Sequence, residues 1–273
     1  MEVALALTNP IVRSRGPRLA GGTLVPEPAP YREFASFYDR LMGDAMFPLV
    51  RRNFESLVRR YGLRFRSAAD VACGTGTFVR YLCGLGAQVF GVDRSRSMLL
   101  RAIRKNRGNR AMFLLQDMRE LLLPFRVDLI TCHFDSMNYL LSHHDLALTL
   151  SRFCTNLSFG GHAIFDMVTD FAEEPKMGGK LQLLRPPAAY SVWLISWQPE
   201  RLLRSVEMLN FIREGGGRYR LEREFHVQRQ YPIGVVVRIA RNCGLAVRGV
   251  HDAHSLALAG PQTYRAVYVV RKP

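Results

Sequence analysis

The feature that most constrains the fold of this chain is a glycine turn that joins a short buried segment to a helical one. Residues 68–72 read as a buried strand, Gly74 and Gly76 form a tight turn, and residues 78–84 read as a helix. Glycine lets the backbone bend sharply and approach a ligand, and the helix after the turn offers free amide groups. A lone G-x-G can also be a purely structural turn, so its meaning depends on the residues at the ends of the neighbouring strands.

The same strand-to-helix rhythm continues along the chain. Further strands are predicted at residues 88–92, 111–116, 127–133 and 162–167, with helices at 95–106 and 144–157, the latter closed by Gly160 and Gly161. Strands that alternate with helices indicate a parallel sheet covered on both faces. The chain is therefore predicted to be an α/β protein of the Rossmann-like class.

The two ends of the chain and a central segment depart from this rhythm. Residues 1–30 are rich in proline and lack periodicity, which predicts a poorly ordered tail, and helices are expected at 31–43 and 47–61. Residues 190–196, 203–212 and 218–230 read as consecutive strands, which predicts an antiparallel insert over 176–230. A helix at 233–243 and strands at 245–252 and 264–271 then complete a core formed by 31–175 and 231–273.

Acidic residues lie at the ends of two neighbouring strands of the predicted sheet. Asp93 ends the second strand, where a carboxylate can accept hydrogen bonds from ribose hydroxyls. Asp117 and Met118 come after the third, where a carboxylate can take an adenine amino group beside an apolar side chain. Each acid could instead cap a helix or a turn. Their shared place at the carboxyl edge, where open α/β sheets bind ligands, favours a nucleoside site.

Several motifs together resemble the class I S-adenosylmethionine-dependent methyltransferases, especially a bacterial branch that acts on small molecules, including N-methyltransferases of amino sugars and glycine. They are Tyr38-Asp39-x-Leu41-Met42, VACGTGTF at 71–78, VFGVDRSRSML at 89–99, LLQDMREL at 114–121, LITCHFDSMNYLL at 129–141 and GGHAIFDM at 160–167. The likeness covers residues 31–170 well and extends more loosely through EREFHVQRQY at 222–231. A third glycine, which a nicotinamide enzyme would normally have, is missing after Thr77.

The resemblance implies a seven-stranded sheet whose last strand is antiparallel, and S-adenosylmethionine as the cofactor. By the same analogy Gly74 and Gly76 lie under the methionine part, Asp93 holds the ribose, and Asp117 with Met118 holds the adenine. The full set of residues expected at the cofactor comprises Tyr38, Ala72, Cys73, Gly74, Gly76, Asp93, Arg94, Met98, Asp117, Met118 and His133.

The chemistry of methyl transfer limits the other groups that the site needs. An in-line displacement from a sulfonium has a good leaving group, so the protein mainly positions the acceptor and excludes water. Neither a metal nor a covalent nucleophile is required, and we expect no metal. An amine acceptor must be neutral, and a hydroxyl benefits from a nearby base.

The loop after the fourth strand and one strand of the insert supply candidate acceptor residues. Asp135, Asn138 and Tyr139 could orient the acceptor, and His133 or Asp135 could take a proton. His133 could equally be a satisfied strand-end residue and Tyr139 a core aromatic. In the insert, Glu224, His226 and Gln228 alternate so that they share one face, which either lines the acceptor pocket or is simply solvated. The catalytic candidates are Asp135, Tyr139, His133 and Asn138, and the substrate candidates are Tyr31, Asn138, Tyr139, Glu224 and His226.

Charge and composition bear on partners. The formal net charge of +15 would suit a polyanion, so the alternative function is an RNA or ribosome methyltransferase. A small-molecule acceptor is favoured because no Asn/Asp-Pro-Pro-Tyr type loop comes after the fourth strand and no separate binding module is visible. The chain has no apolar run long enough to span a membrane, and its odd number of cysteines without a C-x-x-C pair indicates a cytoplasmic setting. A homodimer is a further expectation.

Overall fold

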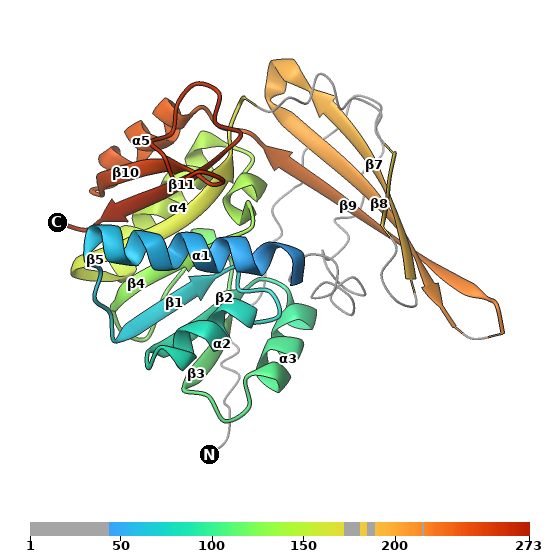
Figure 1. The fold of residues 1–273 in the computed structure, drawn as a ribbon, viewed down its shortest axis with the longest axis horizontal. Helices are drawn as coiled ribbons and strands as arrows, with labels where there is room; N and C mark the ends of the chain where they lie inside the picture. Colours follow the sequence, from blue (N-terminus) through green and yellow to red (C-terminus); the bar gives the residue numbers. More distant parts are fainter. Residues whose placement is uncertain (1–43, 172–180, 185–188, 215) are drawn as a thin grey trace.

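The larger of two sheets carries the carboxyl edge on which the site is built. The structure is a computed structural model that describes residues 44–171, 181–184, 189–214 and 216–273 (Figure 1). The strands of the larger sheet are β1 (Ser67–Val71), β2 (Gln88–Asp93), β3 (Ala111–Leu115), β4 (Val127–Cys132), β5 (Leu157–Val168), β10 (Ala246–Asp252) and β11 (Arg265–Arg271).

These strands are ordered β10-β11-β5-β4-β1-β2-β3. The strands β1 to β5 pair in parallel, whereas β11 runs antiparallel to both β5 and β10. The predicted seven-stranded, mostly parallel sheet with an antiparallel last strand is therefore confirmed. One local expectation is wrong, because Gly160 and Gly161 lie inside β5 and do not close the preceding helix. Both glycines pair there with the backbone of Lys272 near the end of the chain.

Helices cover both faces of the larger sheet (Figure 1). On one face lie α1 (Asp44–Tyr61), α2 (Thr77–Gly84) and α3 (Arg96–Lys105), and on the other lie α4 (His143–Asn156) and α5 (Ile233–Asn242). Neighbouring strand residues point to opposite faces, so Ala68 packs with the first group of helices and Ala69 with the second. Because both faces are buried, the central strands carry mostly apolar side chains on both faces, which is why the sequence shows short apolar runs.

The smaller sheet is antiparallel and projects from the carboxyl edge of the larger one (Figure 1). It consists of β6 (Leu181–Leu184), β7 (Ala189–Gln198), β8 (Leu203–Arg213) and β9 (Tyr219–Arg229), in that spatial order, with the short helix η6 (Pro199–Arg201) between β7 and β8. The predicted antiparallel β insert is present. Strand register places Trp193, Met208 and Glu224 side by side on one face, which we call the inner face. All three are buried, whereas Leu194 and Phe225 on the outer face are exposed.

Several predictions concern residues that the structure does not describe. The N-terminal tail at 1–30, the helix at 31–43 and the side chains of Tyr31 and Tyr38 all lie outside the described residues. The domain boundaries at 175–176 and 230–231 stay predictions. Among the helices of the described segments, none combines the length and apolar character that a membrane crossing requires.

Candidate active site

The turn after β1 has a conformation that few sequences could adopt. Ala72, Gly74 and Gly76 all have positive φ, at 57°, 54° and 75°. A Cβ on Gly76 would lie 2.7 Å from Nδ2 of Asn106 and 2.9 Å from Cβ of Ala102. Gly76 is therefore required both for its left-handed backbone and for its close approach to α3.

Residues at the end of α3 hold this turn in place. Lys105 Nζ donates to the hydroxyls of Thr75 and Thr77 at 3.0 and 2.8 Å, and the Asn106 side chain donates to the carbonyl of Gly76 at 3.1 Å. Neither Lys105 nor Asn106 could be identified from the sequence, because a polar residue at a helix end carries no motif that indicates its partner.

Asp93 at the end of β2 is joined to the turn by hydrogen bonds. Its Oδ2 accepts the amide of Gly74 at 2.8 Å, and its Oδ1 accepts the amide of Ser95 at 2.8 Å. Burial raises the pKa of Asp93, while those two amides act in the opposite direction. Each carboxylate oxygen has a second lone pair, so Asp93 can still accept two hydroxyl groups.

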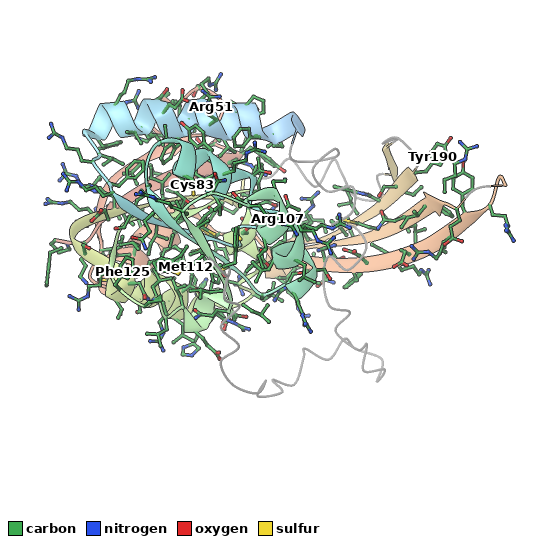
Figure 2. The ribbon with its side chains drawn as sticks, turned by 90° about the horizontal axis from the view of Figure 1, so that it is seen from below. Arg51, Cys83, Arg107, Met112, Phe125 and Tyr190 are labelled. Atoms are coloured by element: carbon green, nitrogen blue, oxygen red, sulfur yellow. The ribbon has the colours of Figure 1, made fainter. Side chains whose placement is uncertain are left out.

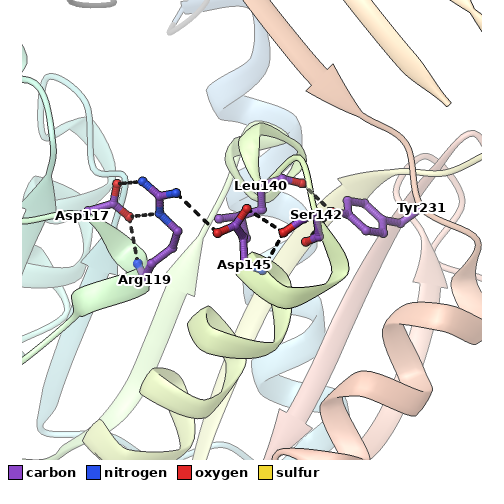
Figure 3. Close-up of polar contacts among 6 residues, drawn as sticks. All are labelled: Asp117, Arg119, Leu140, Ser142, Asp145 and Tyr231. Carbon is purple, nitrogen blue, oxygen red and sulfur yellow. Dashed lines mark hydrogen bonds and ion pairs between the residues drawn. The ribbon is translucent and has the colours of Figure 1, made fainter. Parts of the chain in front are cut away.

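Asp117 after β3 is already paired with Arg119, as Figure 3 shows. Arg119 Nη2 lies 2.8 Å from Oδ2 of Asp117, and its Nε and backbone amide both donate to Oδ1. The same guanidinium reaches Asp145 at 3.4 Å, at the start of α4. Burial opposes the charge of Asp117, but the contacts with Arg119 outweigh it and lower the pKa of Asp117. A lone pair on Oδ2 remains for an amino group. Met118, the first residue of η3 (Met118–Glu120), packs against the core beside it.

Asp70 lies inside β1 beneath the glycine turn, and no role for it was predicted from the sequence. The hydroxyl of Thr131 donates to its Oδ1 at 2.7 Å. Burial raises the pKa of Asp70 to about 7. Burial also raises the pKa of the neighbouring thiol of Cys73, so Cys73 is a small neutral residue beside the turn.

The structure argues against His133 as a proton acceptor. The imidazole is buried at the end of β4, with Phe78 across its ring at 4.4 Å between centroids and Asp166 Oδ1 4.0 Å from its Nδ1. Burial lowers the pKa of His133 to about 3. An imidazole with that pKa stays neutral at physiological pH and is a weak base.

Asp135 is also committed to other protein groups. Its Oδ1 lies 2.9 Å from Nη1 of Arg265, and its Oδ2 accepts the Gln228 side chain at 2.6 Å. The same Arg265 nitrogen pairs with Asp166. Burial disfavours the charge of Arg265, but Asp135 and Asp166 raise the pKa of Arg265 above its ordinary value. The predicted role of Asp135 as a free base is therefore not supported, because its charge is compensated.

Asn138 is a structural residue, contrary to the expectation that it orients an acceptor. It lies in the short helix η4 (Ser136–Tyr139) and is fully buried. Its amide nitrogen donates to the carbonyls of Val168 and Arg229, and its oxygen accepts the amide of Val168 at 2.9 Å. Asn138 thus joins η4 to β5 and to the end of β9, and no donor is left for a ligand.

Tyr139 meets two of the residues expected in the insert. Its hydroxyl lies 2.9 Å from Nδ1 of His226, and Nε2 of His226 lies 3.3 Å from Oε2 of Glu224. Glu224, His226 and Gln228 share the inner face of β9, as their alternation indicated. The guanidinium carbon of Arg94, next to Asp93, lies 5.9 Å from the centre of the Tyr139 ring. Tyr139 therefore lies between the carboxyl edge of the larger sheet, near Asp93, and the insert.

Trp193 of β7 contributes an aromatic side chain to the inner face. Trp193 is buried, and its indole nitrogen donates to the hydroxyl of Ser191 at 2.8 Å.

No group of three or more His, Cys, Asp or Glu side chains suited to a metal ion occurs within the described segments.

Comparison with known proteins agrees with this geometry. The family model described as "Methyltransferase domain" matches residues 68–161. A protein of Geobacillus sp. (strain WCH70), named "Putative methyltransferase GWCH70_2453", is 28% identical over 247 residues, which cover 89% of this chain and 99% of that protein. The dTDP-3-amino-3,6-dideoxy-alpha-D-glucopyranose N,N-dimethyltransferase of Streptomyces fradiae is 36% identical over 102 residues, which cover 37% of this chain and 39% of that enzyme.

A solved structure extends the agreement to the whole fold. The S-adenosylmethionine-dependent methyltransferase of Clostridium acetobutylicum ATCC 824 superposes with a TM-score of 0.78 at 27% identity, covering 88% of this chain and 98% of that one. The superposition includes the insert as well as the larger sheet, since it covers 88% of this chain and 98% of the other. The glycine turn, the sheet order and these relatives lead to one conclusion: the chain is an S-adenosylmethionine-dependent methyltransferase with the Rossmann-like fold of class I.

Proposed function

We propose that the chain methylates a small molecule bound between the carboxyl edge of the larger sheet and the inner face of the insert. The observation that carries this proposal is the contact of Tyr139 with His226. It joins the loop after β4 to a buried polar row on β9, beside the acids at the ends of β2 and β3. A site enclosed in this way suits an acceptor small enough to be surrounded, since methyl transfer requires that water be excluded.

The cofactor residues are assigned from the geometry of the edge. Ala72, Cys73, Gly74 and Gly76 would lie along the methionine part, and Asp93 with Arg94 would hold the ribose. Asp117 and Met118 would hold the adenine. Met98 is buried in the first turn of α3 and would contribute packing only. Tyr31 and Tyr38 stay predictions, and His133 would border the site as a neutral ring.

The cofactor, when bound, supplies an electrophilic methyl group on a sulfonium. The protein's own residues then orient the acceptor in line with the carbon–sulfur bond and keep water away. Arg265 and Gln228 fix Asp135, and Asn138 fixes η4, so that the loop after β4 is rigid before substrate arrives. This preorganisation is the main contribution that such a reaction needs from the protein.

An amine is the acceptor that we favour, although a hydroxyl was equally open from the sequence. The S. fradiae relative acts on an amino sugar, as its name states, and the aligned 102 residues are the most similar stretch among the relatives named above. The inner face also presents a buried carboxylate, Glu224, near the acceptor side. Buried negative charge favours a ligand that becomes positive as it reacts.

Arginines of the described segments lie away from this site as well as beside it. In Figure 2, Arg51 on α1 and Arg107 beyond α3 lie on different parts of the core, and Tyr190 marks the distant part of the insert. Such scattered arginines are expected on a solvated surface, whereas an RNA enzyme would present a continuous basic path. A salt titration of RNA binding distinguishes the two, because phosphate contacts give a steep loss of affinity with salt.

We further propose that the outer face of the insert pairs two copies of the chain. Tyr190, Leu194, Tyr219, Leu221 and Phe225 share that face by strand register, and each is 40% to 50% exposed. An exposed apolar sheet face of this kind is typical of an interface, and a two-fold axis would bring the same strands together.

Calorimetry with S-adenosylhomocysteine tests the proposed cofactor site. We expect the unaltered protein to bind it, and Asp93→Asn to weaken binding at least about tenfold, since a hydrogen bond to a charged group is lost. Asp252→Asn is the matched control, because Asp252 also accepts two backbone amides, but at a distant turn. A panel of primary amines and alcohols, monitored by release of S-adenosylhomocysteine, then identifies the acceptor class. If the unaltered protein does not bind this nucleoside, the proposal is wrong.

A further inference from the structure

We propose that Tyr139, His226 and Glu224 form a proton relay that takes the proton lost by an amine acceptor during methyl transfer. This inference rests on the proposed function and adds the path of the proton. The three residues lie on two elements that are distant in sequence, η4 of the core and β9 of the insert. The relay exists only because the insert packs against the loop after β4.

The contacts determine the direction in which a proton can move. The Tyr139 hydroxyl lies 2.9 Å from Nδ1 of His226, so it can donate to that nitrogen when Nδ1 carries a lone pair. The proton of the neutral imidazole is then on Nε2, which lies 3.3 Å from Oε2 of Glu224. A hydroxyl, an imidazole and a carboxylate follow one another in the order used by sites in which a carboxylate orients a base and the base takes the hydroxyl proton. In the proposed relay, the tyrosine hydroxyl is the group on the substrate side.

The location of Tyr139 connects the relay to the cofactor site. Arg94 lies over the Tyr139 ring and is the next residue after Asp93, the proposed ribose ligand. Asn138, the preceding residue, is bonded to the backbone of β5 and β9, so the position of Tyr139 is closely constrained. The tyrosine hydroxyl is thus held at the boundary between the cofactor residues and the insert.

The other candidate bases are poorly suited to this task. His133 stays neutral because burial lowers its pKa to about 3, and Asp135 is paired with Arg265 and Gln228. His226 is buried, with 3% exposure, beside a carboxylate that is 6% exposed. A buried carboxylate stabilises a neighbouring positive charge strongly, so an imidazolium at His226 would be compensated by Glu224. The charged groups around the relay also include Arg94 from the core and Arg204, which lies opposite Gln228 in the register of β8 and β9.

The proposed step balances in atoms and charge. The amine nitrogen uses its lone pair to form a bond to the methyl carbon, and the carbon–sulfur bond breaks with its electron pair going to sulfur. The positive charge of the sulfonium thereby passes to the methylated nitrogen. That nitrogen loses its proton to the Tyr139 oxygen as the Tyr139 proton passes to Nδ1 of His226. The charge ends on the imidazolium beside Glu224, and a later proton release to solvent resets the relay.

Three substitutions test the relay, and a second tyrosine–histidine pair supplies matched controls. Tyr139→Phe, His226→Gln and Glu224→Gln each break one link. Tyr61→Phe and His251→Gln break the hydrogen bond of 2.7 Å between Tyr61 and His251, which joins α1 to β10 away from the site. Binding of S-adenosylhomocysteine by calorimetry is measured for all five variants. Retained binding shows that the cofactor site is intact, whatever happens to the relay.

With the amine that proves active in the acceptor panel, Tyr139→Phe and His226→Gln are expected to lower kcat about 100-fold or more, with a smaller effect on KM. His226→Gln should alter the pH profile of kcat, because the variant lacks the imidazole that accepts the proton. His226→Ala should recover activity when imidazole is added. The control pair should leave kcat and the pH profile unchanged.

Nitrogen-15 spectra of the free protein provide a readout that needs no acceptor. We expect the neutral ring of His226 to carry its proton on Nε2, and Glu224→Gln to change the population of that tautomer. A proton on Nδ1 would overturn the relay, as would full activity with an unchanged pH profile in Tyr139→Phe and His226→Gln. Activity with alcohols but with no amine would overturn the assignment of the acceptor. Absence of nucleoside binding in the unaltered protein would instead refute the proposed function.

Discussion

At the scale of single residues, Gly76 combines a backbone requirement with a steric one. Its φ of 75° disfavours any side chain, and a Cβ would also meet the atoms of α3. Gly108 has a comparable φ of 83° but open space around it. Comparison of the two positions therefore separates the cost of the left-handed conformation from the cost of the clash.

Gly76→Ala is expected to destabilise the protein by about 3 kcal/mol or more, because conformational strain of about 1–2 kcal/mol is joined by overpacking. Gly108→Ala should cost only the conformational strain of about 1–2 kcal/mol, because open space surrounds Gly108. Urea denaturation measures both free energies of unfolding. Equal losses at the two positions would show that α3 can move away from the turn.

Asp70 predicts an unusual dependence of stability on pH. Its pKa in the folded protein, about 7, lies above its ordinary value of 3.8 because the carboxyl is buried. The folded state therefore holds the proton more tightly than the unfolded chain does. As a consequence, this group lowers stability as pH rises from about 4 to about 7, and the loss is complete above that range.

Asp70→Asn should remove this dependence, because an amide does not ionise. Relative to the unaltered protein, we expect the variant to gain stability as pH rises from 4 to 8, by up to about 4 kcal/mol. Thermal unfolding at several pH values gives the comparison. A difference between the two proteins that does not change with pH would contradict the assignment.

At the scale of elements, η4 is the point at which the core and the insert are joined. Asp135, Asn138 and Tyr139 each contact β9, through Gln228, the carbonyl of Arg229 and His226. A single turn of helix thus makes three different polar contacts with one strand. The insert is held by specific hydrogen bonds there, so the acceptor side should be well ordered before substrate binds.

Asn138→Ala is predicted to cost about 2–4 kcal/mol, because buried backbone groups of Val168 and Arg229 would lose their partners. Asn109→Ala is the control, since Asn109 is exposed and makes one side-chain contact, and its cost should stay below about 0.5 kcal/mol. Urea denaturation reports the stability of each variant. If Asn138→Ala were as stable as the control, water would be replacing the lost contacts and η4 would not be the link between core and insert.

At the scale of the whole molecule, the insert has two faces with different partners. The inner face contacts the loop after β4, and the outer face exposes large apolar side chains. We expect the chain to form a dimer through the outer face, which light scattering after gel filtration would detect. Leu221→Glu combined with Phe225→Glu should give a monomer with an unchanged circular dichroism spectrum. A monomeric unaltered protein at micromolar concentration would refute the proposed pairing.

The order of the strands and the residues along their carboxyl edge could be predicted because they depend on local patterns. Apolar runs between turns identify the buried strands, and the ends of parallel strands necessarily meet at one edge. The positions of Asp93 and Asp117 at this edge could therefore be predicted from the sequence. The alternation of Glu224, His226 and Gln228 likewise predicted a shared face, since side chains of a strand alternate in direction.

The partners of the acceptor-side residues could not be predicted in the same way. Asp135 is a candidate base from the sequence, but its carboxylate is held by Arg265 and Gln228, and Asn138 is a candidate for orienting the acceptor, but its side chain bonds to the backbone of β5 and β9. The class of sheet, the glycine turn and the acids at its edge follow from the order of the amino acids, because they depend on the pattern of neighbouring residues. The contact of Tyr139 with His226 cannot be derived in this way, because it depends on how the insert packs against the core.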